Sequence, residues 1–192
     1  MNAQEQFWAG DFGSEYLKRN RVRWEDRVPF WRQILAITQC RSVLDVGCNA
    51  GWNQRAIRAV DRTIVTTGCD INADAMFEAR EDGLDVRLAS LYSTGNLFCE
   101  KFDLVATTGV LIHVPPRDLR EAMLNISVSS KRWVLAVEYD APKEEEVLYR
   151  GNAERLWKRP FGALYQQMGL ELIADSEAEG FDRCRAWLMV KR

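Results

Sequence analysis

Along most of the chain, short apolar runs alternate with longer segments whose apolar residues recur every three or four positions. This alternation predicts an α/β fold built on a mostly parallel sheet. We expect strands at 42–46, 63–69, 85–89, 102–107, 132–138, 170–175 and 184–190. Helices are expected at 53–60, 73–80, 117–125 and 160–168. The last two strand runs are too close in sequence for a helical crossover, so we expect them to form an antiparallel hairpin.

Both ends of this pattern carry additions. The first forty residues are helical in pattern, and a second insertion separates the fifth strand run from the last helix. A length of 192 residues and a hydrophobic content of 47% fit one domain. We therefore expect a single domain over 1–192, with a helical N-terminal cap at 1–40 and a core at 41–192. The loop at 139–160 follows the carboxyl end of a strand, where α/β sheets bind ligands, and is expected to contact the substrate.

Charge and cysteine content narrow the possible partners. A formal net charge of -2 gives no basic excess for binding nucleic acid. The five cysteines form no CxxC pair and there is only one histidine, so we expect reduced thiols and no bound metal. The N-terminus lacks the pattern of a leader peptide, and no apolar run is long enough to span a bilayer. We expect a cytoplasmic protein without membrane or nucleic-acid partners.

The segment "SVLDVGCNAGWNQRAI" at 42–57 runs from a strand through two glycines into a helix. Gly47 permits a sharp turn, and Gly51 lets the chain pass close to a ligand. The N–H groups at the start of the helix favour a carboxylate or phosphate, whereas Asp45 favours a cationic group. Asp70 follows Gly51 by about twenty residues, the spacing at which an acid accepts hydrogen bonds from ribose hydroxyls. A nucleoside ligand is therefore expected.

The details of this turn distinguish between nucleotide-binding families. The turn has no lysine, which disfavours a phosphate-binding loop, and it lacks the GxGxxG spacing of dinucleotide sites. The alternation of Gly47, Asn49 and Gly51 after Asp45 resembles motif I of the class I S-adenosylmethionine-dependent methyltransferases. The resemblance implies a Rossmann-like seven-stranded sheet and S-adenosylmethionine as cofactor, with its methionine part at the turn. Judged without the rest of the chain, such a turn could also serve only to join a strand to a helix.

The segments that follow the third and fourth expected strands also resemble the corresponding segments of these methyltransferases. In "LASLYS", Ser90 and Leu91 would meet the adenine, although an aspartate is commoner at position 90. "FDLVATTGVLIHVPPRDL" resembles motif IV and its sequel, which places Thr108 beside the reactive methyl group. The cofactor-binding residues implied by the resemblance are Trp8, Asp45, Gly47, Cys48, Asn49, Gly51, Asn53, Asp70, Ile71, Ser90, Leu91 and Thr108.

Four segments indicate a narrower family. "FWAGDFGSEYLKRN" at 7–20, the "GCNAGWN" turn, "GVLIHVPP" and "YRGNAERLWKRPF" together resemble the methylases associated with pseudaminic acid biosynthesis. In such proteins the asparagines of the turn are normal. The resemblance implies transfer of a methyl group to a small molecule such as an amino sugar or sugar nucleotide. We expect a monomer or a weak homodimer.

Two groups of residues are candidates for binding the acceptor. Phe12, Tyr16, Arg19 and Asn20 share one helical face in the N-terminal cap, which suits either a lid over a pocket or simple helix packing. Tyr139, Tyr149, Arg150 and Arg159 come from the loop at 139–160. Arginines suit a carboxylate or phosphate on the acceptor, but these two could instead pair with the acidic run at 144–146.

Methyl transfer needs the acceptor in line with the S–CH3 bond at about 3 Å, and holding that geometry supplies much of the rate. If the acceptor is an amine or a hydroxyl, His113 or Glu138 is the candidate general base. Alternatively, His113 only starts a helix beside two prolines. Two other functional classes stay open: a cofactor-binding module without catalysis, and a nucleotide-dependent oxidoreductase.

Overall fold

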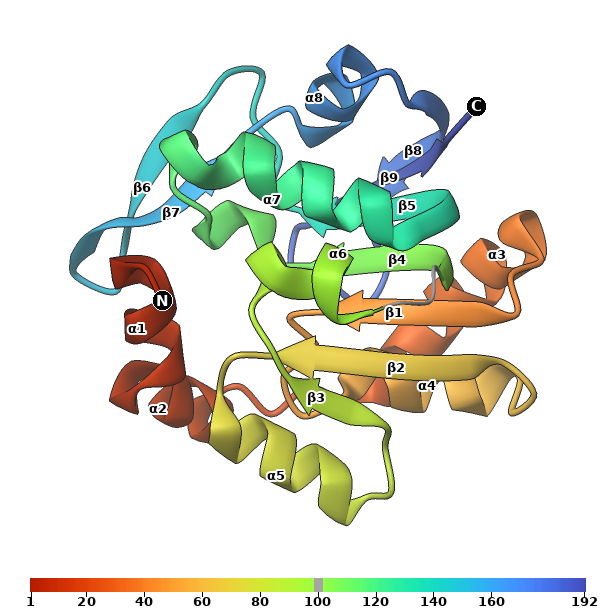
Figure 1. The fold of residues 1–192 in the computed structure, drawn as a ribbon, viewed down its shortest axis with the longest axis horizontal. Helices are drawn as coiled ribbons and strands as arrows, with labels where there is room; N and C mark the ends of the chain where they lie inside the picture. The colour runs from red at the N-terminus through yellow and green to blue at the C-terminus, as the bar shows by residue number, and fades with distance from the viewer. Residues whose placement is uncertain (99–101) are drawn as a thin grey trace.

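A seven-stranded sheet in the order β3-β2-β1-β4-β5-β9-β8 forms the centre of the computed structural model, which describes residues 1–98 and 102–192 (Figure 1). The strands β1 to β5 are parallel, and β9 pairs antiparallel with β5 and with β8. Their bounds are β1 Ser42–Val46, β2 Val65–Asp70, β3 Val86–Leu88, β4 Phe102–Thr108, β5 Ser130–Glu138, β8 Glu171–Glu177 and β9 Arg185–Val190. The predicted Rossmann-like fold with an antiparallel C-terminal hairpin is confirmed.

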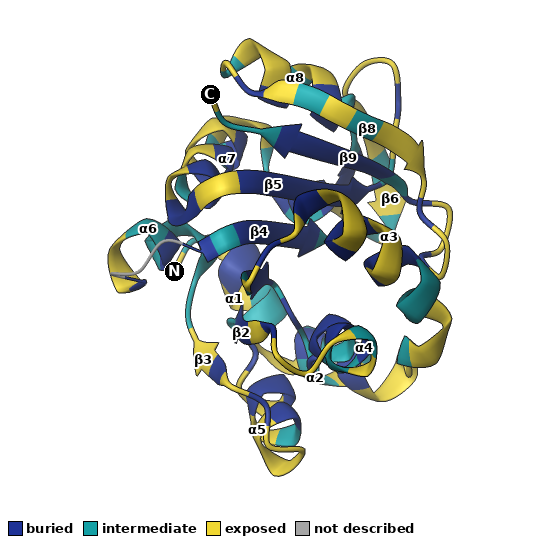
Figure 2. Cartoon of the chain, turned by 90° about the vertical axis from the view of Figure 1, so that its right-hand side faces the viewer, coloured by how far each residue is buried: buried dark blue, intermediate teal, exposed yellow. Residues whose placement is uncertain are grey.

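Helices cover both faces of the sheet because successive strand residues point to opposite sides. Leu44 and Val46 pack in one core with α7 (Pro116–Ser129) and α8 (Phe161–Gln167). Val43 packs in the other core, with α3 (Val28–Thr38) and α4 (Trp52–Val60). The shorter helices α5 (Ala73–Glu81) and α6 (Thr94–Leu97) complete the layers. Most residues of the central strands β4, β5 and β9 are buried, whereas the residues of the edge strand β8 are exposed or half-buried (Figure 2).

The insertion expected as a loop at 139–160 contains a separate two-stranded sheet. β6 (Glu145–Tyr149) and β7 (Asn152–Lys158) pair antiparallel and turn at Arg150 and Gly151, both of which have positive φ (50° and 81°). Positive φ at both central residues is typical of a two-residue hairpin turn. The sequence signal is weak because an arginine occupies the position where asparagine or aspartate usually marks such a turn.

The N-terminal segment is helical as expected. It contains α1 (Ala3–Ala9), α2 (Asp11–Arg19), a 3-10 turn η1 (Trp24–Arg27) and α3. The helices α1 and α2 lie beyond the carboxyl ends of the parallel strands, next to the β6–β7 hairpin (Figure 1). Hydrogen bonds join α1 to the hairpin: Arg155 Nη1 donates to Gln4 Oε1 at 2.7 Å, and Gln4 Nε2 donates to the carbonyl of Arg155 at 3.4 Å. The helix and the hairpin thus cover the same end of the sheet.

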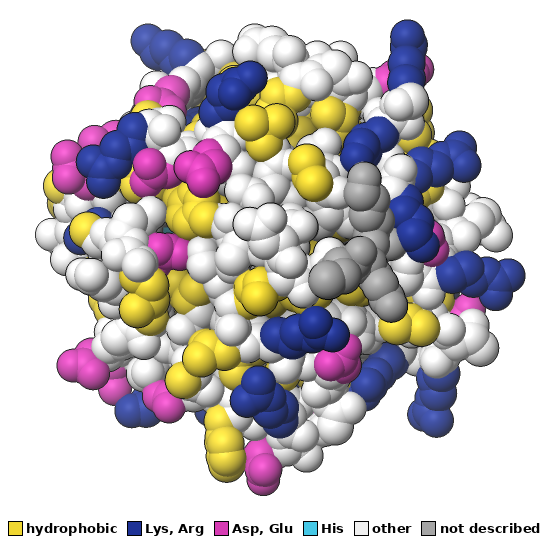
Figure 3. All heavy atoms as spheres, viewed as in Figure 1, with side chains coloured by type: hydrophobic (Ala, Val, Ile, Leu, Met, Phe, Trp, Pro, Cys, Tyr) yellow, Lys and Arg dark blue, Asp and Glu magenta, His cyan; other side chains and the backbone are white. Residues whose placement is uncertain are grey.

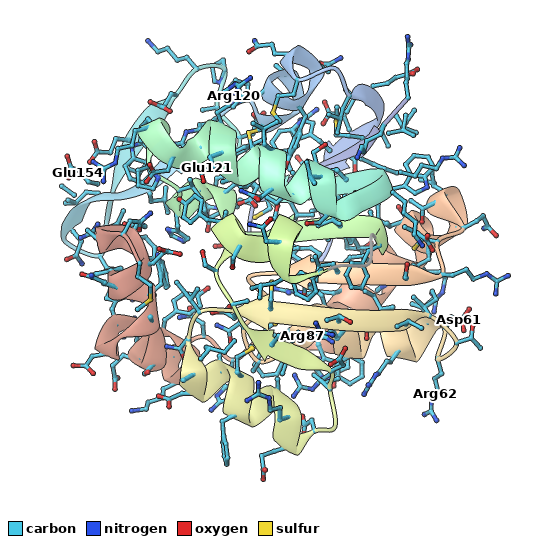
Figure 4. All side chains as sticks on the ribbon, in the orientation of Figure 1. Asp61, Arg62, Arg87, Arg120, Glu121 and Glu154 are labelled. Atoms are coloured by element: carbon cyan, nitrogen blue, oxygen red, sulfur yellow. The ribbon has the colours of Figure 1, made fainter. Side chains whose placement is uncertain are left out.

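The surface carries both signs of charge. In the view of Figure 3, acidic side chains lie mainly toward the side of α1 and the hairpin, with basic ones interspersed. Asp61 and Arg62 extend outward at the opposite end of the sheet, and Glu154 extends from the hairpin (Figure 4). Within the described ranges, no helix has the length and apolar character needed to cross a membrane.

The described cysteines, Cys40, Cys48, Cys69 and Cys184, are buried free thiols, whereas Cys99 lies outside the described residues. Over residues 1–98 and 102–192, no cluster of three His, Cys, Asp or Glu side chains is arranged to hold a metal ion.

Candidate functional site

A cavity lies over the carboxyl ends of β1, β2 and β4, between the sheet and the N-terminal helices. Of the predicted site residues, twelve line it: Trp8, Tyr16, Asn20, Gly47, Cys48, Asn49, Asn53, Asp70, Ile71, Leu91, Thr108 and His113. Ten do not: Phe12, Arg19, Asp45, Gly51, Ser90, Glu138, Tyr139, Tyr149, Arg150 and Arg159. The lining residues that we did not predict to bind a ligand include Gln4, Glu5, Arg27, Trp52, Asn72, Tyr92 and Val110.

The turn after β1 is shaped by glycine. Gly47 has a φ of 73°, and a Cβ at this position would lie 2.4 Å from Cγ2 of Val110. The amides of Gly47 and Cys48 both donate to the carbonyl of Cys69, at 2.7 and 3.0 Å, which ties the turn to the end of β2. Gly51 also has a positive φ, but the missing Cβ makes room for the side chain of Leu84, 2.3 Å from its position. Gly51 thus permits packing below the turn and does not itself face the cavity.

Asp70 lies at the tip of β2 with its carboxylate fixed by two backbone amides. Asn49 N donates to Oδ2 and Asn72 N donates to Oδ1, each at 2.9 Å. Burial raises the pKa of Asp70, while these amides act in the opposite direction. Each oxygen keeps a lone pair, so the carboxylate can accept hydrogen bonds from vicinal hydroxyls in the cavity.

Asp45 lies behind the cavity wall, contrary to our expectation that it contacts the ligand directly. It is fully buried, and both of its oxygens accept from Nδ2 of Asn53 at 3.2 Å. Burial raises the pKa of Asp45 to about 7. Asn53, which lines the cavity, also donates to Thr108 Oγ1 at 3.0 Å. The Asp45 side chain is covered by Asn53 of α4 and acts on the cavity through that hydrogen bond and through its charge.

Arg27 supplies a half-buried cation at the same end of the cavity. Its Nη1 donates to Asn53 Oδ1 at 2.9 Å, and its guanidinium carbon lies 4.2 Å from the ring centroid of Phe181. Its Nε is buried without a hydrogen-bond partner among the described residues. Burial lowers the pKa of Arg27, and the field of Asp45 opposes that shift. No sequence signal distinguishes this residue, because the surrounding segment "RNRVRWEDR" contains four arginines.

His113 ends the 3-10 turn η3 (Leu111–His113), which follows β4. Its Nδ1 lies 2.6 Å from the carbonyl oxygen of Arg155. A carbonyl only accepts, so Nδ1 carries the hydrogen and Nε2 carries the free lone pair. Burial lowers the pKa of His113 to about 4, which keeps the ring neutral at physiological pH. His113 therefore presents a base to the cavity with one defined tautomer.

Glu138 is not placed to act as a base on a ligand. It is fully buried at the end of β5, and its oxygens accept from the backbone amides of Val110, Leu111 and Ile112 at 3.1 to 3.3 Å. Burial raises its pKa to about 7. Its carboxylate satisfies the free amides at the start of η3 and so fixes the turn that carries His113. Sequence position at a strand end does not distinguish this supporting role from catalysis.

Aromatic rings surround His113. The ring centroid of Trp8 lies 4.5 Å from that of His113, and the centroid of Tyr149 lies 5.0 Å from it. Trp8 also contacts Tyr16 edge-on at 5.3 Å, while Phe12 packs behind Trp8, against Phe7 and Tyr149. Phe12 and Tyr149 thus support the cavity wall from behind.

Some of the loop residues predicted to bind an acceptor are instead bonded to other residues of the protein. Arg159 is almost fully buried, with Nε 2.8 Å from Glu144 and Nη1 donating to the carbonyl of Leu111 at 3.1 Å. The alternative of pairing with the acidic run is therefore the one observed for Arg159. Tyr139 donates to Asp182 at 3.3 Å. Arg150 lies at the exposed turn of the hairpin, and its charge acts on Tyr16, whose pKa is raised chiefly by burial.

Two further predicted residues stand outside the lining. Arg19 lies on the outer side of the cap, with its guanidinium carbon 5.4 Å from the ring centroid of Phe12. Ser90 turns its hydroxyl toward Glu5 of α1, to which it donates a hydrogen bond. The Ser90 hydroxyl, which we expected to meet the adenine, is therefore hydrogen-bonded to Glu5.

Comparison with known proteins agrees with this geometry. Residues 44–129 match the family model of a methyltransferase domain. The matched segment runs from β1 through α7 and contains the glycine turn, Asp70, Thr108 and His113. The predicted enzyme class, an S-adenosylmethionine-dependent methyltransferase, is confirmed by this domain. No curated protein matches the sequence significantly.

Solved structures resemble the whole chain in fold. Magnesium protoporphyrin IX methyltransferase from Synechocystis PCC 6803, solved with bound S-adenosylmethionine, superposes with a TM-score of 0.71 at 16% identity, covering 100% of both chains. The sugar N-methyltransferase KedS8 from Streptoalloteichus sp ATCC 53650 gives 0.69 at 14% identity, covering 96% of this chain and 94% of that one. Streptomyces venezuelae DesVI gives 0.68 at 12% identity, covering 94% and 97%. At these identities the likeness concerns the fold.

Proposed function

We propose that this protein transfers a methyl group from S-adenosylmethionine to a nitrogen or oxygen of a small-molecule acceptor by direct in-line displacement. The observation that carries the proposal is the order of groups over the strand tips. A half-buried cation lies beside β1, a carboxylate lies at β2, and an aromatic wall with a neutral histidine follows β4. This order matches the carboxylate, the ribose and the reactive end of the cofactor.

The residues of the cavity fit S-adenosylmethionine chemically. The unpartnered Nε of Arg27 is a donor for the methionine carboxylate, and the lone pairs of Asp70 suit the ribose hydroxyls. Ile71 and Leu91 offer apolar contacts to the base. When bound, the cofactor supplies an electrophilic methyl group on a sulfonium centre. The protein's own task is to hold the two reactants in line and to exclude water.

The acceptor end of the cavity favours a group that loses a proton as it is methylated. His113 is neutral, and its Nε2 lone pair is free to accept that proton. Trp8 and Tyr16 make the adjoining wall apolar, and Glu138 with Arg159 holds η3 from beneath. We assign His113 the role of general base for an amine or hydroxyl acceptor, and Glu138 the role of a positioning residue.

An amino sugar or a sugar nucleotide is the acceptor class that we favour. The resemblance of the N-terminal, turn and hairpin segments to the methylases associated with pseudaminic acid biosynthesis supports it. The fold likeness to a sugar N-methyltransferase agrees with it. Arg150 at the hairpin turn is the remaining predicted candidate for an anionic group on such an acceptor.

The test is a methyl-transfer assay with the full-length protein. S-adenosylmethionine with an isotope-labelled methyl group is incubated with single amino sugars, sugar nucleotides and simple amines, and adenosylhomocysteine and labelled acceptor are quantified by mass spectrometry. Equal amounts of both products with one acceptor class would support the proposal. Tight binding of adenosylhomocysteine without transfer to any acceptor would favour a binding module, and no binding would exclude both readings.

A further inference from the structure

One carboxylate in the cavity is not explained by the proposed reaction. Glu5 of α1 lines the cavity although its side chain is only 9% exposed. It lies 85 residues away in sequence from Ser90, whose hydroxyl donates to Glu5 Oε1. The other oxygen, Oε2, accepts from the amide of Asn2 at 2.8 Å. A buried carboxylate is costly unless its hydrogen-bonding capacity is used, and each oxygen here retains a second acceptor position.

The position of Glu5 corresponds to one part of the ligand. The sheet order β3-β2-β1 places the turn after β1 at one side of Asp70 and the residues after β3 at the other. With the methionine part beside Arg27 and the ribose at Asp70, the base must extend toward β3. There the cavity is lined by Ile71, Leu91 and Tyr92, and the carboxylate contributed to this end is that of Glu5.

We infer that Glu5 recognises the exocyclic amino group of the adenine ring, so that the N-terminal helix selects adenosyl over other purine nucleosides. The inference rests on the proposed function, since it concerns the same cofactor. An adenine amino group only donates, and a carboxylate only accepts, so the two are complementary. The hydroxyl of Ser90 is uncharged, and its hydrogen is already donated to Glu5. Ser90, which closely follows β3, is not an acid, and Glu5 of α1 provides the carboxylate at this position.

The capping role of Glu5 does not account for these contacts. Asn2 and Glu5 form a capping box, in which Asn2 Oδ1 accepts from the Glu5 amide at 2.8 Å and Glu5 returns one oxygen to the Asn2 amide. A capping box at a helix start is normally solvated and needs only one of the two carboxylate oxygens. In this helix the second oxygen is turned inward, toward the end of β3.

The experiment compares two cofactor products that differ only at the N1–C6 edge of the ring, where the inosine base also carries a hydrogen on N1. Adenosylhomocysteine carries an amino group, whereas S-inosylhomocysteine carries a carbonyl oxygen that a carboxylate repels. Dissociation constants of both are measured by isothermal titration calorimetry on the full-length protein, on Glu5→Gln and on Glu15→Gln. Glutamine at position 5 keeps the capping box, because its oxygen still accepts from Asn2, while its amide nitrogen can donate to the inosine oxygen. Glu15 is an exposed control, whose partner Lys18 lies on the surface of α2.

We expect the wild-type protein and Glu15→Gln to prefer adenosylhomocysteine, and Glu5→Gln to reduce that preference by about tenfold or more, the usual effect of a hydrogen bond to a charged group. The melting temperature of the unliganded Glu5→Gln protein should stay close to that of the wild type. A wild-type protein that binds both products equally would overturn the inference without any variant. So would a folded Glu5→Gln protein with unchanged preference. Absence of binding by adenosylhomocysteine to the wild type would instead overturn the proposed function.

Discussion

Arg27 offers the most direct test of where the cofactor's amino acid part binds. Its half-buried guanidinium lies beside the cavity and donates to Asn53 through Nη1, while Nε is buried without a partner in the described chain. If it binds the methionine carboxylate, replacing it by methionine removes the charge and the donors but keeps most of the volume over Phe181. We expect Arg27→Met to weaken the binding of adenosylhomocysteine and to leave the binding of the nucleoside part unchanged.

The magnitude follows from the contacts that Arg27 can make. A hydrogen bond to a charged group contributes about 1.5 to 3 kcal/mol, and a bidentate contact to a carboxylate lies at the upper end of that range. Asn53 accepts from only one of the three guanidinium nitrogens, so a bidentate contact with the carboxylate is still available. We therefore expect a loss of about 3 kcal/mol in binding free energy. This corresponds to a dissociation constant about 150-fold higher. Loss of the cation also removes the favourable field that acts on the pKa of Asp45, but Asn53 still donates to that carboxylate.

The assay is calorimetric titration with adenosylhomocysteine and with 5′-methylthioadenosine, which has no amino acid part. Arg27→Met should lose affinity for the first ligand only. Arg23→Met is the matched control, because Arg23 lies in the same segment but is exposed and paired weakly with Asp26 at 3.8 Å. Equal weakening of both ligands by Arg27→Met would show that Arg27 shapes the cavity as a whole. Unchanged affinity for both would refute the assignment of the carboxylate to this residue.

Three further results are expected. Gly47→Ala should lower the free energy of unfolding by about 2 to 4 kcal/mol, because its Cβ meets Val110 at a positive φ; Gly83→Ala, with φ 66° and open space, should cost only about 1 kcal/mol in urea titrations. His113→Gln should lower kcat at least a hundredfold with unchanged adenosylhomocysteine binding, and wild-type kcat/KM should fall only as the pH drops toward about 4, since an acid limb near 6.5 would contradict the assignment. The raised pKa of Asp45 means that the folded state holds a proton that the unfolded state has lost, so stability should decrease by about 2 to 3 kcal/mol between pH 5 and 8. Asp45→Asn should remove that part of the slope, and an unaltered slope in urea titrations would refute the shift.

The strand and helix pattern was predictable because most elements are amphipathic and pack against one sheet. All seven expected strands agree with the structure to within two residues at each end; β5, for example, begins at Ser130, two residues earlier than expected. The β6–β7 hairpin could not be foreseen in the same way. It lies on the surface, its strands have mixed burial, and its turn uses Arg150 at positive φ. No periodic core face marks such a segment.

The site was predictable where backbone geometry decides the role. Gly47 and Asp70 hold positions that the strand–turn–helix pattern itself requires. The observed contacts differ from the expected role where a polar residue at a strand end turns into the protein. Asp45 and Glu138 follow the same rule of position as Asp70, but their carboxylates are used by Asn53 and by the amides of η3. Burial and hydrogen-bond partners, which a sequence pattern does not contain, separate these cases.

The groups that would distinguish this protein's ligands lie outside the matched methyltransferase domain at 44–129. Glu5 and Trp8 come from α1, Arg27 comes from η1, and the hairpin contributes the carbonyl of Arg155 that fixes His113. The strand tips within this domain can hold the ribose, but both ends of the ligand then meet the cap. Because Arg155 also bonds to Gln4, displacement of α1 would disturb the hairpin on which the histidine tautomer depends. Binding of the cofactor and readiness of the base should therefore respond together to changes in the N-terminal helix.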